Sequence, residues 1–175
     1  LKSGGHTVKR IGNVRKLLAR IENIDVDIVF NICEGFRGRN RESEVPVILE
    51  MFGIPFIGAD GLTLGVTLDK VIAKKCFIAD GVPTARYFRA YLGDDLKKLN
   101  TLGFPLIVKT SQEGTSKGLT PASRVESFQE LQKQVDIINT VYKQPALVEE
   151  FLSGTEFTVP GVGNKNPQAM PVVQY

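Results

Sequence analysis

Residues 109–118 read KTSQEGTSKG and directly follow the apolar run FPLIV at 104–108. The apolar run predicts a buried strand that ends at Lys109. In the loop of small residues after it, backbone N–H groups are free to bind an anion, and glycine lets the backbone approach a phosphate closely. The order differs from the P-loop, in which the lysine follows the glycines. A surface hairpin with an exposed lysine explains the same stretch equally well.

A second stretch rich in carboxylates follows further along the chain, where residues 148–158 read VEEFLSGTEFT. Glu149 and Glu150 come at the end of an apolar strand, and Glu156 follows a turn. A purine that lies along such a strand can bond to its backbone, while a nearby carboxylate can accept hydrogen bonds from ribose hydroxyls. The alternative is a solvated strand edge whose charges discourage aggregation.

A third stretch, Thr67-Leu68-Asp69-Lys70, comes at the start of a predicted helix. Lys70 could reach an anion that lies outside its own helix. A surface lysine is the simpler interpretation when this stretch is taken alone.

The first third of the chain alternates between helical and strand-like patterns. We expect an amphipathic helix over 10–22, a strand over 28–32, a polar loop over 34–41, a helix over 45–52 and an extended segment over 54–58. Elements of this length in this order predict a layered, parallel sheet. A Rossmann-like lobe would need one more strand before residue 10, and no apolar run there supplies it. Residues 58–65 are predicted to form the seam between two lobes.

The rest of the chain predicts a second layered unit. We expect a helix over 68–79, a strand over 87–90, a short helix over 94–102 and strands over 146–152, 156–162 and 170–175, with a turn at 163–167. The first of these helices would place its apolar side at Leu68, Ile72, Cys76 and Ala79. Ser123 and Glu126 have the spacing of a capping box for a helix over 125–138.

Composition excludes several classes of protein. The 175 residues carry a net charge of only +3, evenly spread, which does not favour a nucleic-acid binder. The apolar runs are too short to cross a membrane. Cys33 and Cys76 form no CxxC pair and suit the reducing cytoplasm, and the single histidine, His6, excludes sites that need two imidazoles. The chain starts at Leu1 and stops after a strand-like run, so we expect a piece of a longer protein.

Taken in order, LDK, VKxSxEGxSxG and VEEFLxGxEFTV resemble the ATP-grasp ligases, most closely the D-alanine–D-alanine ligase family. The resemblance extends from about residue 27 to residue 173. It implies an α/β fold with two parts. Residues 1–62 would form a partial Rossmann-like (pre-ATP-grasp) lobe, and residues 63–175 the N-terminal α+β subdomain of an ATP-grasp fold.

The resemblance also implies a role for each matching residue. Lys70 and Lys109 would contact the phosphates of ATP, with Lys109 also close to the purine. Residues 113–118 would be a flap over the triphosphate, and Glu156 would hold the ribose hydroxyls. The flap residues implied to bind are Glu113, Gly114 and Ser116, with Thr115 and Ser116 as catalytic candidates; the adenine edge would be met by Glu149, Glu150, Phe151 and Leu152.

The implied reaction makes an amide in peptidoglycan precursor synthesis, a part of cell wall biogenesis. A carboxylate attacks the γ-phosphate of ATP to give an acyl phosphate, and an amine then displaces phosphate. The implied cofactors are ATP and Mg²⁺, and the family's magnesium ligands would lie beyond Tyr175. We therefore expect this chain to be inactive, and steady phosphate release from ATP would contradict that. The implied partner is D-alanine or another amino acid, with a homodimer possible and neither nucleic acid nor membrane involved.

Some positions depart from the family pattern. Glu34 stands where these ligases usually have a histidine, and an arginine-rich loop (Arg37, Arg39, Arg41) follows it. The arginines could attract an acidic substrate or could belong to a solvated loop. Lys117 in the flap could add a phosphate contact or face solvent. Two alternatives follow: a ligase for a different amino-acid or acidic substrate, and a nucleotide-binding module without turnover. The central hypothesis is that Lys70, Lys109 and Glu156 converge on one ATP.

Overall fold

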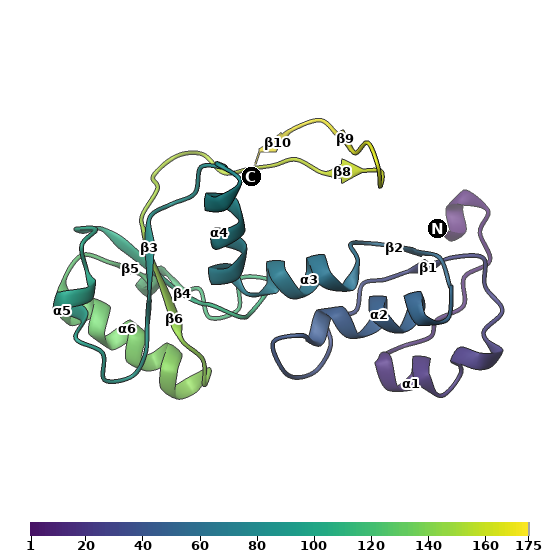
Figure 1. The fold of residues 1–175 in the computed structure, drawn as a ribbon, viewed down its shortest axis with the longest axis horizontal. Coiled ribbons are helices and arrows are strands. Elements are labelled where there is room, and N and C mark those ends of the chain that lie inside the picture. The colour runs from purple at the N-terminus through teal and green to yellow at the C-terminus, as the bar shows by residue number, and fades with distance from the viewer. Residues whose placement is uncertain (175) are drawn as a thin grey trace.

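The computed structural model describes residues 1–174 and is an α/β protein with two separate apolar clusters (Figure 1). The first cluster lies among the elements before residue 57, and the second lies between a four-stranded sheet and the helices that cover it. The helices α3 and α4 lie between these two regions in Figure 1. The predicted fold class is confirmed.

The first apolar cluster joins a short helix, α1, to a parallel strand pair. Strands β1 (Val29–Phe30) and β2 (Phe56–Ile57) pair in parallel, as predicted, although each has only two residues. Between them lie η3 (Arg41–Ser43) and α2 (Glu44–Met51). The buried residues of this cluster are Val14, Leu17, Ile21, Val29, Val45 and Leu49.

The N-terminal helix is shorter than the sequence pattern predicts. After the 3-10 turn η1 (Lys2–Gly4), α1 covers only Val14–Leu18, and a second turn, η2 (Ile21–Asn23), follows it. The predicted span of 10–22 was wrong because Gly12 has a φ of 102° and Asn13 caps the helix by accepting a hydrogen bond from the N–H of Lys16. A left-handed residue directly before the cap prevents an earlier start.

A helix that the sequence pattern did not predict lies within the predicted seam at 58–65. Helix α3 (Gly61–Leu68) is capped by Asp60, whose carboxylate accepts the N–H of Thr63. Two glycines, poor helix formers, hide this helix in the sequence. Gly61 allows close packing on α2, since a Cβ there would lie 2.4 Å from Val47 Cγ2.

Helix α4 (Lys70–Ala79) is capped by Asp69, whose side chain accepts the N–H groups of Val71 and Ile72. The predicted apolar side was wrong. The residues it buries are Val71, Ala73 and Lys74, whereas Cys76 is exposed. The apolar pattern misleads here because Leu68 belongs to α3, and because α4 turns a lysine toward the sheet.

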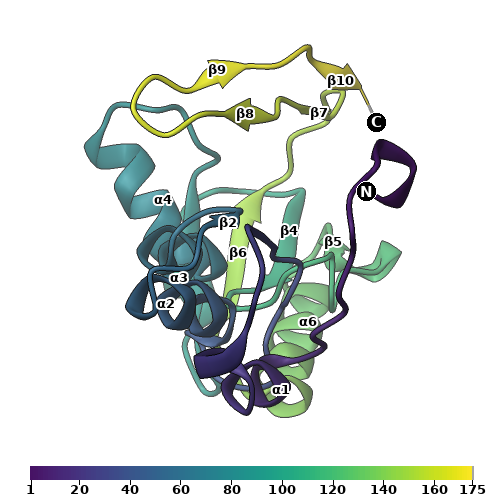
Figure 2. The same cartoon turned by 90° about the vertical axis from the view of Figure 1, so that its right-hand side faces the viewer.

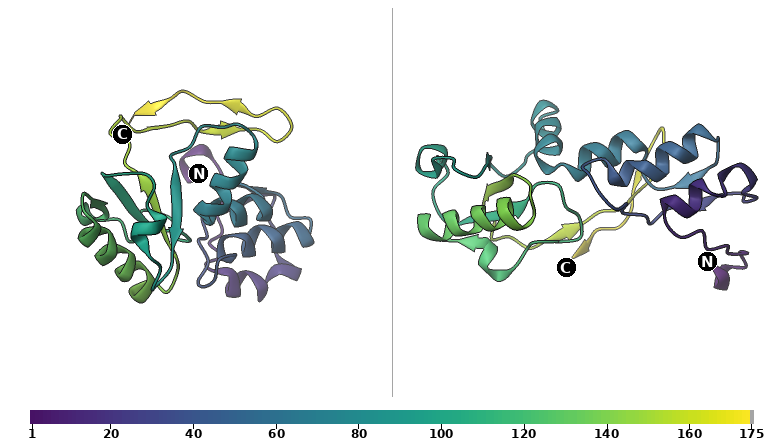
Figure 3. Two further views of the ribbon diagram at one scale, coloured as in Figure 1. Left: turned by 60° about the vertical axis from the view of Figure 1, so that its left-hand side comes forward. Right: turned by 90° about the horizontal axis from the view of Figure 1, so that it is seen from below.

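The second unit is an antiparallel sheet of β3 (Tyr87–Ala90), β4 (Leu106–Thr110), β5 (Arg124–Val125) and β6 (Ala146–Glu150), in the order β3-β6-β4-β5. Helices α5 (Leu96–Leu99) and α6 (Phe128–Val141) pack on one face of it (Figures 1 and 3). The larger buried residues of this core are Leu96, Leu106, Val108, Val125, Leu131, Val135, Ile138 and Val148.

The predicted capping box for α6 was assigned to the wrong residues. Ser123 ends the 3-10 turn η4 (Pro121–Ser123) and forms its box with Thr120. The cap of α6 is Ser127, whose hydroxyl accepts the N–H of Glu130. A short strand, β5, separates the two caps, and the spacing of Ser123 and Glu126 gives no sign of it.

After β6 the chain forms an exposed arm of paired strands. β7 (Phe157–Thr158) pairs with β10 (Val173–Gln174), and β8 (Gly161–Val162) pairs with β9 (Gln168–Ala169). The arm extends away from the sheet, beside α4 (Figure 2). The predicted strands are therefore present in shorter form; Tyr175, the end of the last one, lies outside the described residues. Within residues 1–174 no helix has both the length and the apolar character to cross a membrane.

Candidate functional site

A cavity of about 320 Å³ lies where α3, α4 and β4 meet the loop after β4. Its polar lining combines two lysines, Lys70 and Lys109, with small and hydroxylated residues. The lining residues are Glu42, Thr67, Leu68, Lys70, Lys109, Thr110, Glu113, Gly114, Thr115, Ser116, Lys117 and Leu119.

Lys70 is held at the start of α4 by contacts with the loop after β4. Its backbone N–H donates to Ser111 O over 2.9 Å, and its Nζ donates to the backbone oxygen of Glu113. Burial lowers the pKa of Lys70, and the positive charge of Lys109 lowers it further. An anion in the cavity would relieve both effects, because it would favour the charged ammonium.

Lys109 belongs to a buried ion-pair chain. Its Nζ lies 2.6 Å from Oε2 of Glu149, and Oε1 of the same carboxylate lies 2.6 Å from Nζ of Lys74. In the sheet register Glu149 faces Ile107, so it is a diagonal neighbour of Lys109 on one face of the sheet. Burial acts to raise the pKa of Glu149, but its hydrogen bonds and ion pairs with Lys109 and Lys74 outweigh burial and lower it.

Lys74 is the member of this series of ion pairs that lies on α4. Its side chain is only 7% exposed, and its Nζ also donates to Thr84 Oγ1 over 2.7 Å and lies 5.2 Å from the ring centre of Tyr87. Lys74 was not among the predicted site residues. The available signal was its position four residues after Lys70, which puts both lysines on one side of a helix.

The loop of residues 113–118, predicted as a flap, forms one wall of the cavity. Thr115 and Ser116 have φ angles of 48° and 57°, and their side chains are exposed at the cavity. Lys117 does not simply face solvent: its Nζ lies 3.0 Å from Oε2 of Glu113. Thr110 closes the loop at its far end, where its hydroxyl donates to the backbone oxygen of Lys117 over 2.9 Å.

The carboxylate of Glu113 is the centre of this loop's contacts. It accepts Nε2 of Gln144 on Oε1 over 3.2 Å and Nη2 of Arg41 on Oε2 over 3.1 Å, besides Lys117. Burial acts to raise the pKa of Glu113, but the Lys117 hydrogen bond and the Arg41 charge outweigh it and lower the pKa.

Arg39, in the loop after β1, and Arg41, the first residue of η3, each form an ion pair with a carboxylate of the protein. Arg39 lies 2.9 Å from Oδ2 of Asp69, and Arg41 bonds to Glu113. These arginines were predicted either to attract an acidic substrate or to be solvated; in the structure each has a carboxylate partner within the protein.

Glu42, also missed from the sequence, presents a carboxylate to the cavity. Burial raises its pKa, and the charge of Glu34 acts in the same direction. Only its position directly after Arg41, in a loop already marked by its departures from the family pattern, pointed to it.

The predicted residues after Glu149 lie apart from the two lysines. Glu150 pairs with Arg86, with 2.8 Å between its Oε2 and the arginine Nε. The ring of Phe151 stacks under Arg124 at 4.6 Å, and Leu152 and Glu156 are exposed. Lys70 and Lys109 thus share one cavity, while Glu156 does not line it, so the convergence is present for two of the three residues.

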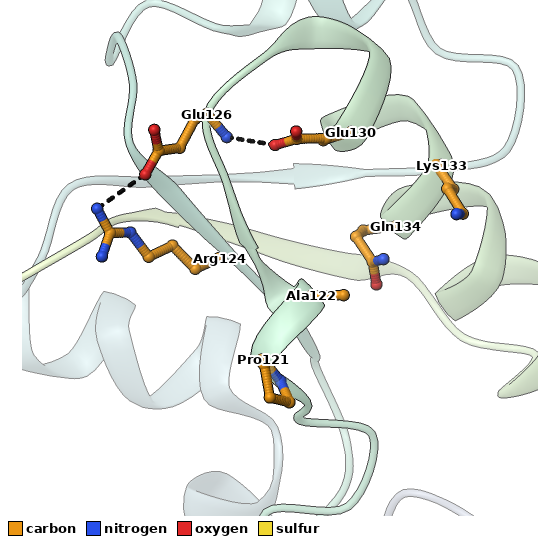
Figure 4. Close-up of a pocket in the computed structure, with 7 residues that line it drawn as sticks. All are labelled: Pro121, Ala122, Arg124, Glu126, Glu130, Lys133 and Gln134. Atoms are coloured by element: carbon orange, nitrogen blue, oxygen red, sulfur yellow. Dashed lines mark hydrogen bonds and ion pairs between the residues drawn. The ribbon is translucent and has the colours of Figure 1, made fainter.

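A second depression, of about 470 Å³, lies beside η4 and the start of α6 and shares no residue with the first (Figure 4). Three of its charged residues contact one another: Arg124 lies 2.8 Å from Glu126, and the N–H of Glu126 donates to Glu130 over 2.7 Å. Its lining residues are Pro121, Ala122, Arg124, Glu126, Glu130, Lys133 and Gln134. In residues 1–174 no three His, Cys, Asp or Glu side chains gather closely enough to hold a metal ion.

The sequence of the chain is similar to those of known proteins. The model of the family described as "D-ala D-ala ligase C-terminus" matches residues 79–175. The uncharacterized protein y4sG of Sinorhizobium fredii is 38% identical over 85% of this chain and 43% of its own length. A D-alanine–D-alanine ligase of Carboxydothermus hydrogenoformans is 30% identical over 97% of this chain and 55% of its own length.

The fold is also found among solved structures. The D-alanine–D-alanine ligase of Bacillus anthracis complexed with ATP superposes with a TM-score of 0.72 at 23% identity, over 94% of this chain and 52% of that one. The chain spans about half the length of the curated relatives it matches.

Proposed function

Because the chain belongs to the D-alanine–D-alanine ligase family, we propose that it supplies the nucleotide-binding half of an ATP-dependent ligase that joins two amino acids through an amide bond. The family uses ATP and small amino-acid substrates. The single observation that carries the proposal for this chain is the cavity in which Lys70 and Lys109 lie under the loop of residues 113–118.

The residues of the cavity fit a triphosphate. Ammonium groups, hydroxyls and backbone N–H groups are the donors that phosphate oxygens accept, and a glycine in the loop permits close approach. The lowered pKa of Lys70 also marks a place where burial leaves an ammonium short of negative charge. We assign the β- and γ-phosphates to Lys70, Lys109 and the loop, with Thr115 and Ser116 as hydroxyl donors.

The proposed reaction transfers the γ-phosphoryl group of ATP to a substrate carboxylate with loss of ADP, after which an amine displaces phosphate and forms the amide. The protein's part is to neutralise charge on the transferring group and to exclude water beneath the loop. Mg²⁺ would add positive charge at the phosphates, but the described residues do not form a ligand set for it, and we assign none.

The adenosine end of the nucleotide is assigned to the end of β6 and the residues that follow it. Backbone groups of residues 150–152 would meet the adenine edge, and Glu156 would meet the ribose. Glu156 is exposed and does not line the cavity that holds the two lysines, so it is assigned to the ribose and not to the β- and γ-phosphates.

The acceptor is proposed to be D-alanine or another amino acid. Glu34 favours the second choice, since a carboxylate stands at the position where the family usually has a histidine. Product analysis of the full-length protein with candidate amino acids separates the two. A homodimer and a division of the chain after residue 62, two residues into α3, are proposed on family grounds; sedimentation and limited proteolysis test them.

Calorimetric titration of this chain with AMP-PNP and Mg²⁺ tests the proposal. We expect binding that the Lys70→Gln and Lys109→Gln variants each weaken by about tenfold, the loss expected for a hydrogen bond to a charged group. Lys75→Gln, an exposed lysine on the same helix, is the control and should bind normally. Equal affinity in all four proteins would contradict the proposed site.

A further inference from the structure

We infer that Arg41 is a positioning residue that fixes the loop of residues 113–118 over the lysines, an inference that rests on the proposed function. Arg41 ends the loop after β1 as the first residue of η3, far along the chain from the residues of the 113–118 loop that it contacts. Its side chain is 12% exposed, which is low for an arginine.

The guanidinium holds the loop at two adjacent points. Nη1 of Arg41 donates to the backbone oxygen of Gln112 over 2.9 Å, and Nη2 donates to Oε2 of Glu113 over 3.1 Å. These contacts join residues 71 and 72 positions apart in sequence. One planar group therefore fixes both the backbone and the side chain at the point where the loop begins, which a lysine could not do.

Neighbouring contacts hold Arg41 itself in place. Nη1 also donates to the backbone oxygen of Gly38 at 3.3 Å, and a Cβ on Gly35 would lie 2.3 Å from the backbone oxygen of Arg41. Arg39 pairs with Asp69, and the same oxygen of Asp69 accepts Nε2 of Gln112 over 3.1 Å. The arginine-rich segment of residues 37–41, the cap of α4 at Asp69 and the start of the loop of residues 113–118 (the nucleotide loop) thus form one hydrogen-bonded network.

Glu113 is where this network meets the proposed phosphate ligands. Its carboxylate accepts a hydrogen bond from Nζ of Lys117, and its backbone oxygen accepts one from Nζ of Lys70. When a triphosphate binds, both ammonium groups can turn from Glu113 to phosphate oxygens. Arg41 and Gln144 then remain as the partners that keep the Glu113 carboxylate in place.

The loop needs such a tether because its own structure is weak. Thr115 and Ser116 adopt left-handed φ angles, and small, exposed residues form few packing contacts. Without Arg41 we expect the loop to open more often, and the affinity for the β- and γ-phosphates to fall while contacts with the nucleoside persist.

The test compares the wild-type chain with Arg41→Gln, Arg41→Lys and a matched control, Arg37→Gln. Arg37 is exposed in the same loop and forms no ion pair within residues 1–174. Two quantities are measured: amide hydrogen exchange of residues 112–118, and the dissociation constants of AMP-PNP and AMP with Mg²⁺. AMP lacks the β- and γ-phosphates, so the loss of a loop that holds those phosphates should weaken AMP-PNP alone, whereas a general structural defect would weaken both ligands.

We expect Arg41→Gln to exchange these amides about tenfold faster and to bind AMP-PNP about tenfold more weakly, with AMP affinity unchanged. Arg41→Lys should fall between the wild type and Arg41→Gln, and Arg37→Gln should match the wild type. Unchanged exchange in Arg41→Gln overturns the inference, as does an equal loss of affinity for both nucleotides.

If Arg41→Gln does not fold, Glu113→Gln removes the other partner and is judged by the same measurements. If the wild type binds neither nucleotide, the proposed function fails for this chain. The exchange rates still decide whether Arg41 holds the loop, so the two failures are distinguishable.

Discussion

Nζ of Lys109 lies 2.6 Å from Oε2 of Glu149, and through the other oxygen of that carboxylate it is linked to Lys74, inside the contact between α4 and the sheet. A proposed phosphate ligand is thus oriented by a carboxylate that is itself fixed from behind. Such support limits the positions that Lys109 can adopt, which is how a binding site keeps its geometry without ligand.

Replacing Glu149 with glutamine should destabilise the protein by about 3 kcal/mol, because it leaves the buried ammonium of Lys74 without a countercharge. Urea unfolding measures the change. Glu150→Gln is the control at a less buried pair: Arg86 is 65% exposed and Glu150 27%, so we expect a smaller loss of stability. Equal losses of stability in Glu149→Gln and Glu150→Gln would show that the buried ion pairs of Glu149 stabilise the protein no more than the pair between Glu150 and Arg86.

Stability should fall in acid because several carboxylates have a lower pKa in the folded protein than in the unfolded chain, and Glu149 and Glu113 are the most buried of them. The pKa values of Glu149 and Glu113 both lie below the ordinary 4.5. A lowered folded pKa stabilises the protein above the ordinary value, and this stabilisation is lost as the pH falls through 4.5 toward the folded pKa. Unfolding free energies measured between about pH 7 and about pH 3 should show this decline. Glu149→Gln should show a shallower decline, and an unchanged slope would contradict the assignment.

The sequence predicts the strands and the identity of the two cavity lysines because these depend on local patterns. The apolar runs before Lys109 and Glu149 form strands, and Lys70 starts a helix capped by its neighbour Asp69. The pairing of the strands then brings the residues together, and the family resemblance indicates which of them to examine.

What the sequence could not predict depends on contacts between distant segments. Arg41 and Glu113 are 72 residues apart, and neither has a local pattern that identifies the other as its partner. A pattern of apolar residues predicts that a charged residue such as Lys74 faces solvent. Lys74 is buried instead because its partner, Glu149, lies on another element, β6. Helix α3 forms where Gly61 permits close packing on Val47, an effect that helix propensity does not include.

Triphosphate binding in alkaline solution should be accompanied by proton uptake at Lys70. Burial and the charge of Lys109 lower its pKa in the free protein, and phosphate charges would raise it again. Between the lowered pKa and the ordinary lysine value of about 10.4, part of the population must gain a proton on binding AMP-PNP. Titration calorimetry in two buffers of different ionisation enthalpy measures this uptake.

Lys70→Arg provides the control for that measurement, because a guanidinium stays charged throughout this range. We expect the variant to bind without the additional proton, while Lys75→Gln keeps it. The same uptake in Lys70→Arg would assign the proton to another group.

Gly118→Ala should destabilise the end of the nucleotide loop. Gly118 has a φ of 85°, and a Cβ there would lie 2.8 Å from Thr110 Cγ2 and 3.2 Å from Tyr142 Cζ. Backbone strain and this overlap together should cost about 1–3 kcal/mol, measured by urea unfolding. Thr110 also donates its hydroxyl to Lys117, so relief of the overlap by rotation of Thr110 would break the bond that closes the loop. Gly154→Ala is the control, since a Cβ there would meet no atom within 4 Å. A Gly118→Ala variant as stable as Gly154→Ala would mean that the loop end yields without cost and is not fixed as described.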